Sequence, residues 1–61
     1  MDMEILKKAQ ANLEEKGIYA KIENETLYVC IGDVELELAD YEIKYQANEM
    51  IAKEYELNQN K

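Results

Sequence analysis

The sequence contains no arginine, histidine, serine or proline. Without histidine there is no ordinary general base near neutral pH, and neither a Ser–His nor a Cys–His pair can form. Without arginine the chain lacks the usual bidentate ligand for guanine and phosphate. These absences exclude the commonest hydrolytic mechanisms, so we expect a protein that is not an enzyme and that holds no cofactor.

The chain is short, and its thiol content is low. A domain of 61 residues buries only about 60% of the surface that its unfolded chain exposes. We therefore expect one domain, 1–61, with a thin core and no room for an active-site cleft. The single cysteine, Cys30, cannot form an internal disulfide, which fits a reducing compartment. No apolar run approaches a bilayer span and the first residues are acidic, so we expect a cytoplasmic protein.

The charge is strongly negative. Fourteen acidic residues against seven lysines leave a formal net charge of -7. Phosphate backbones and anionic membranes would repel such a chain, which excludes direct nucleic-acid binding and membrane-surface binding. The charge instead favours a protein partner with a basic surface.

The apolar pattern changes period along the chain. Ile5, Leu6, Ala9 and Leu13 fall on one face of a helix, which Asp2 can cap. After the first glycine, apolar residues alternate with polar ones, as in half-buried strands. The predicted elements are a helix over about 2–16, strands over about 18–23, 26–31 and 34–38, a helix over about 40–57 and a frayed tail over 58–61.

The strands form a consistent register. Two-residue loops would place every inward side chain opposite another inward side chain, which predicts an antiparallel meander. Gly32-Asp33 suits such a turn, whereas Asn24-Glu25 leaves a four-residue loop open as an alternative. We expect an α+β fold of two layers, α-β-β-β-α, with both helices on one face of the sheet and roughly 18 buried apolar side chains. The second helix would contribute Ile43, Ala47, Met50, Ile51 and Leu57 to this core.

The order α-β-β-β-α resembles the double-stranded-RNA-binding domain. That family grips phosphates with a lysine cluster at the start of its last helix. Here the segment reads Ala39-Asp40-Tyr41-Glu42-Ile43-Lys44, with the opposite charge. We therefore carry over no RNA-binding residue, and the missing histidine also removes what a toxin nuclease on the same fold would need.

An acidic run spans the third predicted strand and the start of the second helix. Its spacing does not match a calcium loop, and we expect no metal site. The structural interpretation is a solvated edge whose charges discourage aggregation. The functional interpretation is mimicry of nucleic-acid phosphates, and small acidic proteins with which phages inhibit host enzymes are similar in size and composition.

All five tyrosines fall at positions that the predicted core does not need. Tyr41, Tyr45 and Tyr55 share the outer side of the second helix, and Tyr19 and Tyr28 share the solvent face of the sheet. Exposed aromatic residues with a polar rim are typical of protein interfaces, although isolated surface tyrosines are common. Both interpretations remain open at this point.

The pattern as a whole indicates a small acidic binding protein that inhibits a larger protein by docking on its basic surface, by mimicry or by simple electrostatic attraction. The alternative is a structural homodimer that pairs through the tyrosine stripe or the open sheet face. The candidate partner-binding residues are Asp33, Glu35, Glu37, Asp40, Tyr41, Glu42, Tyr45 and Tyr28.

Overall fold

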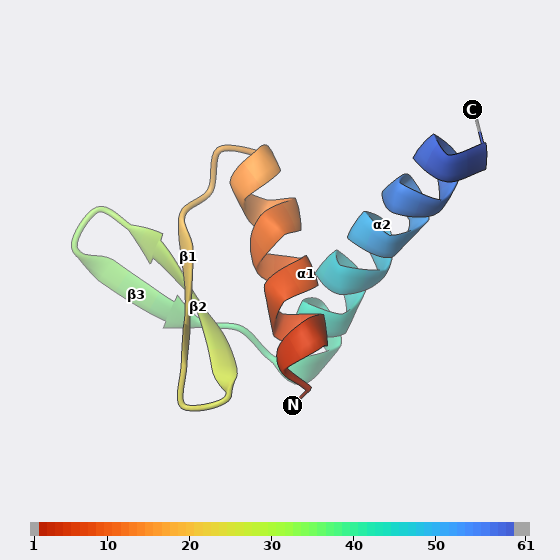
Figure 1. The fold of residues 1–61 in the computed structure, drawn as a ribbon. Helices are drawn as coiled ribbons and strands as arrows, with labels where there is room; N and C mark the ends of the chain where they lie inside the picture. Colours follow the sequence, from red (N-terminus) through yellow and green to blue (C-terminus); the bar gives the residue numbers. More distant parts are fainter. Residues whose placement is uncertain (1, 60–61) are drawn as a thin grey trace.

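The computed structural model describes residues 2–59 of the chain. Its elements are α1 (Met3–Glu15), β1 (Ala20–Glu23), β2 (Thr26–Ile31), β3 (Val34–Glu37) and α2 (Asp40–Gln59). The strands form one antiparallel sheet in the order β1-β2-β3, beside the two helices (Figure 1). The predicted α+β class and three-stranded meander are confirmed. Part of the predicted tail is helical as far as Gln59, while residues 60 and 61 lie outside the described residues.

The helix α1 has a specific structure at each end. The side chain of Asp2 accepts a hydrogen bond from the Glu4 N–H, which satisfies one free donor of the first turn. At the other end Gly17 adopts a φ of 81°. The Ile18 N–H then donates to the Leu13 carbonyl, completing a Schellman motif. The chain therefore leaves the helix at the glycine, as its position predicts, and enters the sheet.

The meander has the predicted register. Ala20 lies opposite Val29, and Val29 lies opposite Leu36. The first turn has two residues, Asn24 and Glu25, with φ of 52° and 59°. Positive φ at both positions is the signature of a type I′ hairpin turn, so the four-residue alternative is excluded. The inward and outward faces of the sheet are thereby set for all three strands.

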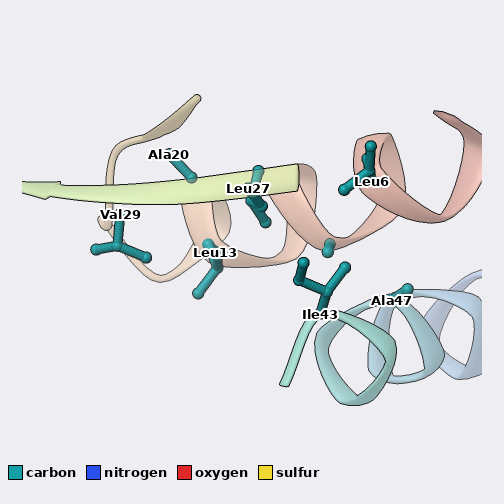
Figure 2. Close-up of a cluster of buried hydrophobic side chains, with 8 residues drawn as sticks. Leu6, Leu13, Ala20, Leu27, Val29, Ile43 and Ala47 are labelled. Atoms are coloured by element: carbon teal, nitrogen blue, oxygen red, sulfur yellow. The ribbon is translucent and has the colours of Figure 1, made fainter. Parts of the chain in front are cut away.

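The core lies between the inward face of the sheet and the two helices. Leu6 and Leu13 of α1 meet Leu27 and Val29 of β2, and Ile43 of α2 points into the same cluster (Figure 2). The helix α1 lies against β1 and β2, whereas α2 packs mainly on α1. Both helices thus contribute to one core on the same side of the sheet, and the other side faces solvent.

The core is smaller than the sequence pattern predicts. Nine described apolar side chains are buried, against the roughly 18 expected from an ideal two-layer fold. Ile51 and Leu57, which were predicted to lie in the core stripe of α2, are exposed. That prediction was wrong for two reasons. Ile51 directly follows the buried Met50 and therefore lies off the side of α2 that packs on α1, whereas Leu57 lies in the last turns of α2, which extend beyond α1 (Figure 1).

The covering layer also stops short of the second hairpin. Ile31, Val34 and Leu36 lie on the inward face of the sheet, yet they are 60%, 55% and 50% exposed. No substantial contact joins β3 to either helix among residues 2–59. The β2–β3 hairpin therefore projects from the core with one apolar face uncovered.

Candidate protein-binding surface

The outward face of the sheet carries three of the predicted binding residues. Tyr28 lies opposite Glu37 across the β2–β3 ladder, and Glu35 lies opposite Cys30. Because side chains alternate along a strand, all four project away from the helices. Glu35 and Glu37 are exposed and Tyr28 is half-buried. The structure therefore brings these carboxylates together with a tyrosine on an uncovered face.

One lysine partly neutralises the negative charge of this outward face. Lys21 Nζ lies 2.8 Å from Glu35 Oε2 and 3.4 Å from Glu23 Oε2. The hydrogen bond to Glu35 holds the pKa of Lys21 above its usual value. Glu37 has no such ion pair among the described residues. The free negative charge on this face is therefore concentrated at the β3 side.

Asp33 lies at the far tip of the same hairpin. It follows Gly32, whose φ of 60° lets the chain turn between β2 and β3. The side chain of Asp33 is exposed. It lies in the turn directly before β3 and adds a third carboxylate next to the two that the strand carries. Asp33, Glu35 and Glu37 thus form an acidic row, the name used for these three residues below.

The remaining predicted residues belong to α2. Asp40, Tyr41 and Tyr45 are exposed, with Tyr41 77% and Tyr45 59% accessible. Glu42 differs, because it is half-buried and accepts a 2.9 Å hydrogen bond from Gln46 Nε2. The predicted site is therefore divided into the acidic row with Tyr28 on the sheet and an aromatic surface on the helix.

A polar network between the helices was not predicted. Asn12 and Gln46 are almost fully buried, and Asn12 Nδ2 donates to Gln46 Oε1 at 2.6 Å and to Glu49 Oε1 at 2.8 Å. Lys53 Nζ in turn donates to Asn12 Oδ1 at 2.8 Å. Among the described side chains, no buried polar atom lacks a hydrogen-bond partner. The network therefore satisfies the groups that it buries, as a stable interior requires.

The charged members of this network shift one another's pKa. Lys16 Nζ donates to Glu49 Oε1 at 2.8 Å. This bond, with the second one from Asn12, lowers the pKa of Glu49 to about 2, and it raises the pKa of Lys16. A signal for the network was present in the sequence. Asn12 follows Ala9 by three residues and Gln46 follows Ile43 by three, so both lie on the apolar faces of their helices.

An open cleft of about 480 Å³ lies beside the ends of the two helices. Its walls carry no thiol or hydroxyl nucleophile, and Lys53 pairs with Glu15 at 3.4 Å. The residues lining it are Glu15, Met50, Lys53, Glu54, Glu56 and Leu57.

Neither a metal site nor a membrane-spanning helix is found in the part of the chain that the structure describes. Over residues 2–59, no three carboxylate or thiol groups converge in a way that could hold a metal ion. Neither helix in this range combines the length and apolar character that a bilayer crossing requires. Comparison of the chain with protein-family models, curated proteins and solved structures finds no match.

Proposed function

We propose that this chain is a small acidic, non-enzymatic protein-binding module that docks on a basic surface of a larger protein and inhibits it. The observation that carries the proposal is the uncovered outward face of the sheet. There the acidic row lies beside Tyr28, with no helix over it. Carboxylates attract a basic partner at long range, and a half-buried tyrosine supplies contact area at low entropic cost.

The charge balance supports docking on protein rather than on nucleic acid. A net charge of -7 accelerates association with a basic surface and repels phosphate. The regular strand spacing of Glu35 and Glu37 supports a specific form of inhibition, in which these carboxylates occupy positions that phosphates would take. Under this mechanism, a DNA duplex competes with the chain for the partner. Simple electrostatic attraction to a site elsewhere on the partner predicts no competition.

The proposal is tested by capture from a cell lysate. The immobilised chain should retain a basic protein at low salt and release it in a salt step, because exposed charges are screened at high ionic strength. A Glu35→Gln/Glu37→Gln variant should lose most of this capture. The matched control is Glu4→Gln/Glu14→Gln, which removes the same charge from exposed positions on α1. Capture that is insensitive to salt, or equal loss in both variants, contradicts the proposal.

A second candidate function is a structural homodimer. Tyr41, Tyr45 and Tyr55 are 77%, 59% and 64% exposed, so three large aromatic side chains lie uncovered along α2. Two copies could bury this stripe about a two-fold axis. Sedimentation at two concentrations separates the candidates, since a monomer at both concentrations excludes an obligate dimer.

A further inference from the structure

The open edge of β3 differs from the opposite edge of the sheet. In an antiparallel ladder, residues alternate between those whose backbone N–H and C=O point to the neighbouring strand and those whose groups point away. The Leu38 N–H donates to the Leu27 carbonyl at 2.9 Å, so the even-numbered residues of β3 point to β2. The backbone groups of Glu35 and Glu37 therefore point outward.

The two edges are protected to different degrees. At the β1 edge, Gln10 Nε2 of α1 donates a 2.9 Å hydrogen bond to the Ala20 carbonyl. At the β3 edge, no hydrogen bond within residues 2–59 reaches the backbone of Glu35 or Glu37. In Figure 1, β3 lies on the side of the sheet away from α1. An extended segment of another chain can therefore add to β3 but is hindered at β1.

The side chains at this edge define what such a segment must carry. Val34 and Leu36 are about half-exposed on the inward face, where a neighbouring strand would bury them. Glu35 and Glu37 are exposed on the outward face. A strand that alternates apolar residues with lysine or arginine would match both faces, because opposite charges on adjacent strands attract and apolar pairs pack together.

A second copy of this chain does not meet that requirement. Every β3 residue whose backbone faces the open edge is acidic, as is Asp33 before it. In a two-fold antiparallel pair of β3 strands, residues whose backbone groups face the open edge lie opposite one another. Each register therefore places a carboxylate opposite a carboxylate. Like charges directly opposite destabilise a strand pair. The same charges that oppose self-pairing select a basic partner.

We propose that β3 binds an extended segment of its partner by strand addition, and that this segment alternates apolar with basic residues. The inference rests on the proposed function, because it names how the protein partner docks. The added strand hydrogen-bonds to the backbone of Glu35 and Glu37, places its basic side chains beside their carboxylates, and covers Val34 and Leu36. The partner thereby adds a fourth strand to the sheet at its open β3 edge.

The test uses the whole chain and a short synthetic peptide that alternates lysine with valine. Amide hydrogen exchange measured by NMR should slow at Glu35 and Glu37 when the peptide is added, whereas Val34 and Leu36 already bond to β2 and serve as internal references. A peptide of equal composition, with its lysines in one half and its valines in the other, should bind about tenfold more weakly. Equal binding of the two peptides, or binding without protection of the two amides, overturns the proposal.

Variants separate strand addition from general charge attraction. Glu37→Pro removes an outward N–H and leaves the ladder to β2 intact, so it should abolish peptide binding, while Glu37→Gln keeps the N–H and should only weaken it. Unfolding curves show first whether Glu37→Pro is folded. Should it fail to fold, Glu35→Lys/Glu37→Lys replaces it and must prefer a glutamate–valine peptide. An unchanged preference for lysine overturns the proposal.

The outcome also distinguishes this inference from the proposed function. If the lysate partner is captured in a salt-dependent way by wild type and equally by folded Glu37→Pro, the strand-addition mode fails and the proposed function stands. If no salt-dependent capture occurs but the peptide adds to β3, the proposed function fails and the strand-addition mode stands. Concentration-dependent self-association that protects the Glu35 and Glu37 amides without peptide would identify a second copy as the occupant and overturn the inference.

Discussion

Asn12 and Gln46 join α1 to α2 through a 2.6 Å hydrogen bond from Asn12 Nδ2 to Gln46 Oε1, although both side chains lie on the apolar faces of their helices. Apolar contact alone is non-directional and tolerates sliding of one helix along another. A buried amide pair is directional, and any displacement leaves its polar groups unpaired at a cost of about 1–3 kcal/mol each. The pair therefore fixes the position of α2 on α1.

Removal of Asn12 tests this pair directly. We expect Asn12→Leu to lower the free energy of unfolding by about 1–3 kcal/mol, since it removes the donor to Gln46 and Glu49 and the acceptor for Lys53. Asn12→Leu/Gln46→Leu should lose less than the sum of the single variants, with a coupling energy of about 0.5–3 kcal/mol. Urea unfolding followed by circular dichroism measures all three variants. Strict additivity would show that the two amides act independently.

The pKa of Glu49 predicts how stability responds to acid. Its ordinary value of 4.5 falls to about 2 in the folded chain, so the unfolded state binds the proton more tightly. The stabilisation from ionised Glu49 is therefore complete above about pH 4.5 and is lost as the pH falls from there towards 2. Glu49→Gln should be less stable than wild type at pH 7, and the difference should vanish near pH 2. Glu14→Gln, at an exposed position outside the network, serves as the control; a Glu49→Gln difference that persists unchanged at pH 2 contradicts the assignment.

A pair of leucines on β2 and β3 tests where the core ends. Leu27 is fully buried and Leu36 is 50% exposed, although the sequence pattern places both on the inward face. Leu27→Ala should lower the free energy of unfolding by about 2–5 kcal/mol, which approaches the whole stability of so small a domain. Leu36→Ala should cost less than about 1 kcal/mol, because little apolar surface is lost from the core. Thermal unfolding of both variants is the measurement, and equal losses would mean that the hairpin is covered.

The first turn offers a stabilising substitution. Glu25 adopts a φ of 59°, a conformation that costs an ordinary L-residue about 1–2 kcal/mol. Glu25→Gly relieves this strain and creates the Asn-Gly pair that type I′ turns favour, although glycine also loosens the unfolded chain. We expect a net gain of about 0.5–1 kcal/mol in the free energy of unfolding. Glu25→Ala removes the same carboxylate but keeps the Cβ, so it should give no comparable gain; a similar gain from Ala would assign the effect to charge.

The elements and the register could be predicted because local chemistry specifies them. Asp2 and Gly17 mark the ends of α1 through backbone hydrogen bonds that involve only near neighbours. The alternation of apolar residues sets which side chains face inward, since a slip of one residue would turn a whole strand over. The exposure of Tyr41, Tyr45 and Tyr55 followed from the same helical geometry and is confirmed.

The candidate site was predicted less completely than the fold. The carboxylates of β3 were correctly placed on the outward face beside Tyr28, because strand period alone decides this. Glu42 was expected at the surface, yet it turns towards Gln46, a residue whose burial depends on packing between helices far apart in sequence. The acidic run was treated as one surface, whereas the chain divides it between the sheet and α2.

The absence of arginine and histidine and the net charge of -7 follow from the sequence alone, and a net charge of this sign repels phosphate whatever the fold. The sequence also determined which face of each element is apolar. Only the tertiary structure decided how far that face is covered, because the spacing of apolar residues along one element does not specify where the opposing helix ends. Val34 and Leu36 are uncovered because neither helix reaches over β3, Asn12 is buried because α2 packs on α1, and the edge at Glu37 is open because β3 is the last strand of the sheet.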